Sequence, residues 1–188
     1  MIVALGRGLE AYIIFKGEVL AFEPEGGEGL FTGSPPRFLK PSGAGSRGPF
    51  SWRPLEFEGL RGRVTGYEVL VGGTRVVYAG GAKEPFSVEA DVILAPAGGG
   101  WYMDAKGFCK TLRMSKFKVA VPIAVWNPGT NLPLEGIEEV RNECRGFNRV
   151  RAMGSWKVHF KGGKATVALI EPGRPQLIIK KLLKSGRL

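Results

Sequence analysis

The apolar and polar positions of this chain alternate mainly with the short periods of β-strands. Residues 11–15 form an apolar run, Lys16-Gly17 predicts a tight turn, and residues 19–22 predict the returning strand. The segment 67–78 has two such runs around Gly72-Gly73, which is typical of a hairpin with a two-glycine turn. Further apolar runs of strand length occupy residues 91–96, 119–125 and 165–170.

Two segments have helical spacing instead. Apolar residues recur every three or four positions in 103–115 and again in 134–144, which predicts one helix in each. The segment 177–183 is compatible with a strand or with a short basic helix. Because a strand, a helix and a strand follow one another over 91–125, we expect α/β layers. The sequence therefore predicts a strand-rich α/β fold, with residues 1–188 in one domain.

Residues 25–53 depart from this pattern because Gly, Pro and Ser dominate them. We expect a long loop of about 30 residues, and loops of that length are usually functional or disordered. Its aromatic residues could order on a protein partner or cover the protein's own sheet. These residues are Phe31, Phe38, Phe50 and Trp52.

Composition indicates a globular protein. Of the 188 residues, 44% are hydrophobic and 23% are charged, which excludes a disordered chain. No apolar run approaches the roughly 20 residues that span a bilayer, so we expect no membrane partner. The first residues lack a basic segment and a cleavage site, so we expect no export signal and a cytoplasmic location.

The net charge of +10 is concentrated at one end of the chain. Residues 1–140 have 15 basic and 15 acidic side chains, whereas residues 141–188 have 12 basic side chains and only Glu143 and Glu171. A neutral body with a basic end favours an anionic partner.

Cysteine and histidine are scarce. Cys109 and Cys144 have no metal-binding spacing, and His159 is the one histidine, which argues against a zinc site. A single glutamine, four asparagines and 13 prolines favour a thermophile. The two cysteines are interpreted either as isolated buried thiols or as a disulfide, which intracellular proteins of hyperthermophiles do contain.

Six segments, in order, resemble the metallo-β-lactamase fold, in its branch of ascorbate-6-phosphate lactonase and related metal-dependent hydrolases. Leu5-Gly6-Arg7 is similar to a Leu-Gly-His of that branch, and Phe22-Glu23-Pro24 to its Ile-Asp-Pro. The hairpin ending Tyr78-Ala79-Gly80-Gly81 resembles one ending Tyr-His-Ala-Gly-Asp. The remaining likenesses are the strand, glycine turn and helix start over 90–105, the strand 119–124, and Ile170-Glu171-Pro172-Gly173.

The resemblance implies an αββα sandwich, and in the family two metal ions activate a water for hydrolysis. Here the family's metal ligands are replaced. Arg7, Gly81 and Ala124 stand where the resemblance places His, the bridging Asp and His, and the segment 25–53 contains no His and no Asp. We therefore expect no cofactor and no metal-dependent catalysis. A Mg²⁺ site made from Asp91, Asp104 and Glu84 is a weaker alternative.

The basic end could provide a surface for nucleic acid. Alternation predicts that the basic residues of 149–151 and 157–161 face solvent, and if these two strands are neighbours, they form one cationic face. The candidate nucleic-acid-binding residues are Arg149, Arg151, Lys157, Lys161, Lys164, Lys180, Lys181 and Lys184. Alternatively, these lysines and arginines protect a sheet edge from pairing. On this strand, Trp156 and Phe160 are interpreted as core residues, with base stacking as the alternative.

Three functional hypotheses follow. The first is a non-catalytic metallo-β-lactamase-like protein that binds a partner, with RNA or DNA backbone contacted by the basic end. The second is a subunit that docks a protein through residues 25–53. The third is an enzyme without metal, with a pocket near Gly98–Asp104. Gly98-Gly99-Gly100 is not a phosphate-binding P-loop, and we interpret it as a turn that lets the following helix pack, with an anion held at the helix start as the alternative.

Overall fold

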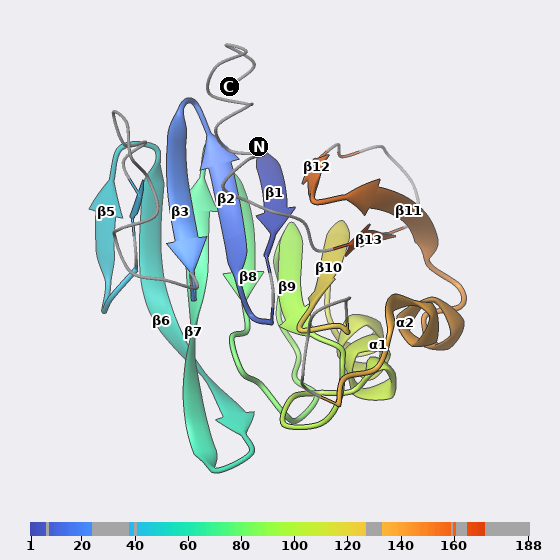
Figure 1. The fold of residues 1–188 in the computed structure, drawn as a ribbon. Coiled ribbons are helices and arrows are strands. Elements are labelled where there is room, and N and C mark those ends of the chain that lie inside the picture. The colour runs from blue at the N-terminus through green and yellow to red at the C-terminus, as the bar shows by residue number, and fades with distance from the viewer. Residues whose placement is uncertain are drawn as a thin grey trace.

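Two β-sheets pack face to face, and two helices cover the outer face of the larger sheet (Figure 1). The computed structural model describes residues 1–6, 8–23, 38–39, 41–126, 133–158, 160 and 165–171. None of the described helices is long and apolar enough to cross a bilayer. The second helical layer of an αββα sandwich is not among the described elements.

The smaller sheet has five strands in the order β12-β1-β2-β3-β4. It is antiparallel apart from the pairing of β3 with β4. Its strands are β1 (Ile2–Leu5), β2 (Ala11–Phe15), β3 (Glu18–Phe22), β4 (Phe38–Leu39) and β12 (Ser155–Lys157).

The larger sheet has eight strands in the order β11-β13-β10-β9-β8-β7-β6-β5. The five strands from β11 to β8 run parallel, and the other three continue as antiparallel hairpins. The strands are β5 (Gly45–Arg47), β6 (Phe50–Gly59), β7 (Gly62–Val71), β8 (Thr74–Tyr78), β9 (Val92–Pro96), β10 (Val119–Ile123), β11 (Asn148–Met153) and β13 (Thr166–Glu171).

Each face of the parallel strands is buried against a different layer. In β9, Val92 and Leu94 face the smaller sheet, whereas Ile93 and Ala95 face helices α1 (Ala105–Met114) and α2 (Ile137–Glu143). All five residues of β9 are buried, as are all five of β10. A strand that is covered on both faces needs apolar side chains on both of them. The burial of β9 and β10 therefore confirms the strands predicted from these two apolar runs.

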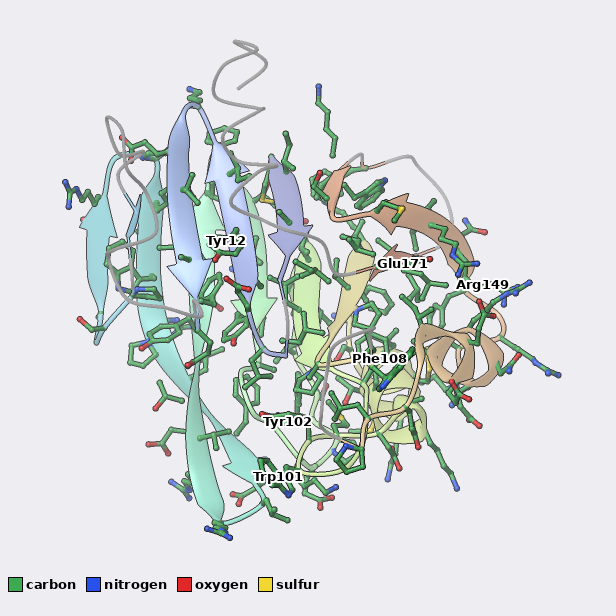
Figure 2. The ribbon with its side chains drawn as sticks, in the orientation of Figure 1. Tyr12, Trp101, Tyr102, Phe108, Arg149 and Glu171 are labelled. Carbon is green, nitrogen blue, oxygen red and sulfur yellow. A yellow bond between two sulfur atoms is a disulfide. The ribbon has the colours of Figure 1, made fainter. Side chains whose placement is uncertain are left out.

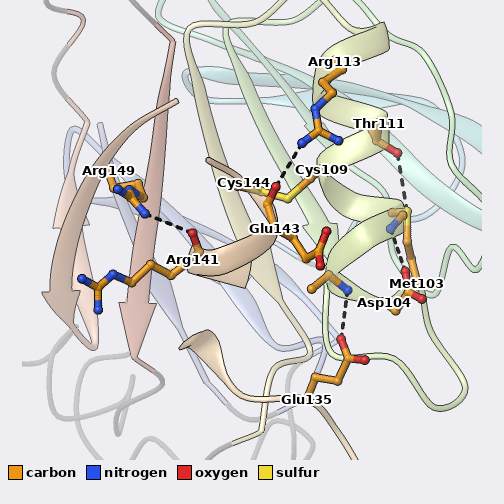
Figure 3. The surroundings of a disulfide bond; sticks show 12 residues. Met103, Asp104, Cys109, Thr111, Arg113, Glu135, Arg141, Glu143, Cys144 and Arg149 are labelled. Carbon is orange, nitrogen blue, oxygen red and sulfur yellow. Dashed lines mark hydrogen bonds between the residues drawn. A yellow bond between two sulfur atoms is a disulfide. The ribbon is translucent and has the colours of Figure 1, made fainter. Parts of the chain in front are cut away.

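A disulfide joins the two helices. Cys109 of α1 is bonded to Cys144, the residue that ends α2, and both side chains are fully buried (Figure 3). Of the two interpretations left open by the sequence, the structure therefore has the disulfide.

The prediction of a loop over residues 25–53 is wrong for the second half of that segment. Strand β5 and the start of β6 lie within it, and Phe50 is buried between the sheets with Trp52 packed against the same cluster. Register explains why: β5 pairs with β6, and β6 pairs along its whole length with β7. Cross-strand pairing and burial outweigh the low strand propensity of Gly, Ser and Pro. Residues 24–37 and 40 lie outside the described residues, as do the side chains of Phe38 and Leu39.

Candidate functional site

The positions at which the resemblance implies metal ligands lie at the carboxyl ends of β8, β9 and β10. Gly81 follows β8, and Ala124 follows β10 directly. The Ala124 N–H donates to the carbonyl oxygen of Gly8 at 2.8 Å, which brings the turn between β1 and β2 to this edge. Ala124 has a φ of 51°, an uncommon conformation for a residue with a side chain. The sequence motifs therefore converge at one edge, although Arg7 lies outside the described residues.

Aromatic side chains fill this edge (Figure 2). Tyr78 stacks on Phe22 with ring centroids 4.2 Å apart, and its hydroxyl donates to the carbonyl oxygen of Leu9 at 3.0 Å. Burial raises the pKa of Tyr78 well above its usual value, and the charge of Glu23 raises it further. Burial and Glu23 also raise the pKa of Tyr102. Ionisation of the Tyr78 and Tyr102 phenols is therefore disfavoured at this edge.

Gly81 has no side chain at the position where the resemblance implies a bridging aspartate. A Cβ atom built on it would lie 3.8 Å from the Tyr102 ring and 3.9 Å from Leu9 and Val64. The neighbours at this position are thus an aromatic ring and two apolar side chains. Among the described residues, no three His, Cys, Asp or Glu side chains are grouped closely enough to hold a metal ion.

The three carboxylates considered for Mg²⁺ are not brought together. Asp91 precedes β9, at the amino ends of the parallel strands, where it binds Lys118 Nζ at 2.7 Å. Asp104 lies beyond the carboxyl end of the same strand, where it caps α1. Glu84 lines a shallow hollow with Asp104. The Mg²⁺ alternative is therefore wrong for this set of ligands.

The protein's own carboxylates occupy the start of α1. Asp104 accepts a hydrogen bond from the Gly107 N–H at 2.6 Å, and Glu135 Oε2 accepts one from the Ala105 N–H at 3.1 Å (Figure 3). Negative groups at a helix N-terminus satisfy its free N–H groups and its dipole. The glycine turn serves packing, because a Cβ on Gly98 would lie 1.8 Å from the carbonyl oxygen of Ala124. The alternative of an anion bound at this helix start is therefore not supported.

The basic end places its described residues on two different sheets. Arg149 and Arg151 are exposed on β11, the edge strand of the larger sheet, whereas Lys157 is exposed on β12, the edge strand of the smaller sheet. The predicted single cationic face required these two strands to be neighbours in one sheet. That requirement is wrong, because the chain passes from the larger sheet to the smaller sheet at Gly154. The other candidate residues lie outside the described residues: Lys161, Lys164, Lys180, Lys181 and Lys184. His159 lies outside them as well.

The two arginines of β11 have different partners. Arg149 donates from its guanidinium to the carbonyl oxygen of Arg141 at 3.0 Å, near the end of α2 (Figure 3). Arg151 instead forms ion pairs with Glu171 at 2.8 Å and with Glu138 at 3.4 Å. Charge at Arg151 is therefore partly neutralised within the protein.

Sequence reasoning also assigned Phe160 to the core, whereas it is 44% exposed. The ammonium group of Lys118 lies 5.1 Å from the centre of its ring, a cation–π contact. Trp156 packs against the core as predicted.

Sequence reasoning did not predict a hollow at the amino ends of β8, β9 and β10, which is lined by Arg75, Lys116 and Lys118 among others. The alternation of Lys116-Phe117-Lys118 was the signal that could have indicated it.

Comparison with known proteins rests on structure alone, since no family model and no curated protein matches this sequence. A Thermotoga maritima protein assigned to the Zn-dependent hydrolases of the metallo-β-lactamase superfamily superposes with a TM-score of 0.70 and 13% identity. That superposition covers 90% of this chain and 98% of the other.

Two further solved structures superpose over most of their length. Igni18, a metallo hydrolase from Ignicoccus hospitalis, has a TM-score of 0.58 at 13% identity, covering 93% of this chain and 97% of its own. A protein from Parabacteroides distasonis assigned as a metal-dependent hydrolase has a TM-score of 0.54 at 14% identity, covering 77% and 88%. These superpositions establish a shared fold, and at identities this low they transfer no activity.

Proposed function

We propose that this chain, whose fold is that of the metallo-β-lactamase superfamily, is a non-catalytic protein that binds the phosphate backbone of nucleic acid. The surface would be formed by the edge strand β11 with Arg149 and Arg151, joined by Lys157 and by the basic residues beyond it in the sequence. The fold points to hydrolase ancestry. The site chemistry, rather than the fold, must decide the activity.

The replacement of the metal ligands supports a non-catalytic role. The whole chain contains one histidine, so no rearrangement of its residues could rebuild a metal centre made of several imidazoles. Gly81 and Ala124 have no side chain that binds a metal. The described edge therefore lacks the groups that activate a water for hydrolysis.

The observation that carries the binding proposal is the position of Arg149. It lies on an edge strand, and one of its five N–H donors is used in the bond to the Arg141 carbonyl, which fixes the direction of the side chain. The remaining donors can reach phosphate oxygens, for which the guanidinium geometry is well suited. Arg141 and Arg145 are also exposed nearby, and residues 141–188 contain almost no carboxylates.

A competing explanation is that these arginines only prevent β11 from pairing with another chain. The two explanations differ in what they predict for ligands. A protective edge has no affinity for nucleic acid beyond that of other basic residues, whereas a binding surface loses affinity when its own cations are changed.

The test is fluorescence anisotropy with single-stranded RNA, single-stranded DNA and duplex DNA at about 50 and 200 mM salt, where phosphate contacts show their salt dependence. We expect binding that weakens steeply with salt and falls at least tenfold in R149E/K157E. The control R61E/R63E makes the same change of charge on the β6–β7 hairpin and should keep affinity within about twofold. No binding at 50 mM, or equal losses in both variants, would overturn the proposal.

A further inference from the structure

A hollow of about 480 Å³ lies at the amino ends of three consecutive parallel strands, β8, β9 and β10. Its volume is within the range of small-ligand sites. It lies at the opposite end of these strands from Gly81 and Ala124, so it is separate from the edge where the resemblance implies metals. Its lining combines three cations and two carboxylates with apolar side chains. The charged residues are Arg75, Lys116, Lys118, Glu89 and Asp91, and the large apolar ones are Leu70 and Phe117.

We propose that this hollow binds a nucleoside phosphate as one unit of a single-stranded nucleic acid. This inference rests on the proposed function and extends it, because it places a specific subsite on the path of the strand. The phosphate is held by Arg75 and Lys116, and the base lies against the apolar part of the lining.

The charges in the hollow leave two cations available. Asp91 is committed to Lys118 at 2.7 Å and to the Arg75 N–H at 2.9 Å, so the Lys118 charge is already balanced. The Arg75 guanidinium forms no ion pair with any described residue. Lys116 and Glu89 are 3.8 Å apart, with both side chains more than two-thirds exposed, so this pair is weak. An anion entering the hollow therefore meets a guanidinium that has no ion pair within 4.0 Å of a described residue, although its charge acts on Asp91 through space, and a weakly paired ammonium.

The apolar part of the lining is exposed in a way that suits a base. Leu70 of the lining is 49% exposed. Phe160, whose ring centre lies 5.1 Å from the Lys118 ammonium, is 44% exposed at the border of the hollow. Single-stranded nucleic acids bind where cations follow the backbone and aromatic faces accept bases. Each component is present within one hollow and its border.

Strand register connects the hollow to the basic edge. Val76, Val92 and Val119 are register partners across β8, β9 and β10. The same row continues through Thr166 of β13 to Asn148 of β11, the residue before Arg149. Four strand spacings of about 4.8 Å give a span of about 19 Å. Arg75, the hollow and Arg149 thus lie along the amino ends of the parallel strands, where a short extended strand can contact all of them.

The experiment compares the full-length protein with R75A/K116A and with the control K106A/K110A, which removes two exposed lysines of α1. Binding of a fluorescent single-stranded oligonucleotide containing 4-thiouridine is titrated over a range of salt. Loss of this one phosphate contact should reduce the slope of log K against log salt by about 0.7 in R75A/K116A and leave it unchanged in the control. Photocrosslinks should map to peptides containing Leu70, Phe117 or Phe160.

The outcomes separate the two proposals. If R149E/K157E weakens binding and R75A/K116A leaves both slope and crosslinks unchanged, the hollow is not a subsite and the proposed function stands. A third arm titrates uridine monophosphate alone. If the protein binds this nucleotide through Arg75 and Lys116 but does not bind the oligonucleotide, the hollow is a site for free nucleotides. That result would overturn the proposal that it binds a unit of a single-stranded nucleic acid. Absence of binding in all arms overturns both proposals. Thermal unfolding of each variant confirms that it is folded.

Discussion

Cys109 and Cys144, 35 residues apart in the sequence, are covalently joined beneath the surface where α1 meets α2. Closing a loop of this length restricts the unfolded chain and is expected to stabilise the fold by about 4 kcal/mol. We predict that C109A/C144A lowers the free energy of unfolding by up to that amount in guanidinium titrations. Dithiothreitol should shift the wild-type midpoint and leave that of the double variant unchanged. A wild-type midpoint insensitive to reductant would contradict the prediction.

Gly98 and Gly81 should respond differently to alanine. The carbonyl oxygen of Ala124 fills the space of a Cβ on Gly98, and the backbone must move to relieve the overlap. We expect Gly98→Ala to cost about 1–3 kcal/mol in chemical unfolding, as overpacking does. Gly81→Ala adds the same methyl group with no atom closer than 3.8 Å, and it should change stability by less than about 0.5 kcal/mol. Equal effects would contradict this account of the glycine turn.

Asp91 should make stability depend on pH in the acid range. Burial acts to raise its pKa, but the bonds from Lys118 and the Arg75 N–H outweigh burial, so its pKa is lowered in the folded protein. The group therefore stabilises the fold above its unfolded pKa, and this contribution is lost as pH falls through the folded pKa. Asp91→Asn should cost about 1 kcal/mol at pH 7, and the difference from wild type should disappear in strong acid.

Glu89→Gln is the matched control for Asp91. Its carboxylate lies at the same end of the sheet, but its pair with Lys116 is exposed and 3.8 Å long. In urea titrations at pH 7, this variant should change the free energy of unfolding by less than about 0.5 kcal/mol. A pH-independent loss in Asp91→Asn would show that the carboxylate acts through packing instead of charge.

Tyr78 should be among the last tyrosines to ionise. Its phenol is buried and its hydroxyl is bonded to the Leu9 carbonyl, so the folded protein resists forming the phenolate. In an alkaline titration followed at the phenolate absorbance, we expect Tyr78→Phe to remove amplitude from the late phase and none from the early phase. The same variant should lose about 1 kcal/mol of stability, because the carbonyl of Leu9 loses its partner. Loss of early amplitude would contradict the neutral state of this phenol.

Purified protein should carry no stoichiometric zinc or manganese. The prediction follows from the residues: one histidine in the chain, and Gly81 and Ala124 at two ligand positions. Elemental analysis should find well under one metal ion per chain, and EDTA should leave the unfolding temperature unchanged. Stoichiometric metal, or phosphoesterase or lactonase activity that requires it, would overturn the non-catalytic proposal.

The sequence predicted the elements whose periodicity is local. Residues 105–114, 92–96 and the hairpin around Gly72-Gly73 have the expected structure because their apolar spacing matches their burial. Helix α2 begins at Ile137, three residues after the predicted start. The metallo-β-lactamase fold could also be predicted from the sequence, because its turn motifs occur in order along the chain.

Long-range pairing was not accessible from the sequence. The alternation of residues 149–157 fits two strands in one sheet as well as it fits strands in different sheets, and the structure has the second. Strand β5 was hidden because its residues, Gly45, Ser46 and Arg47, have no strand signature of their own and depend on β6 for pairing. The hollow beside Arg75 was missed because its lining comes from three separate turns, which only the parallel register brings together.

Gly154 has a mechanical consequence for strand β11. This residue alone separates β11 in one sheet from β12 in the other. Its N–H donates to the backbone carbonyl oxygen of Glu171 at the end of β13. Its own carbonyl oxygen accepts from the Leu5 N–H at the end of β1. A force applied to β11 is therefore divided between the two sheets. Pulling this strand away must break its bonds to β13 and strain the bonds of β12 to β1 at the same time. The edge strand of the larger sheet is in this way anchored against peeling away from β13.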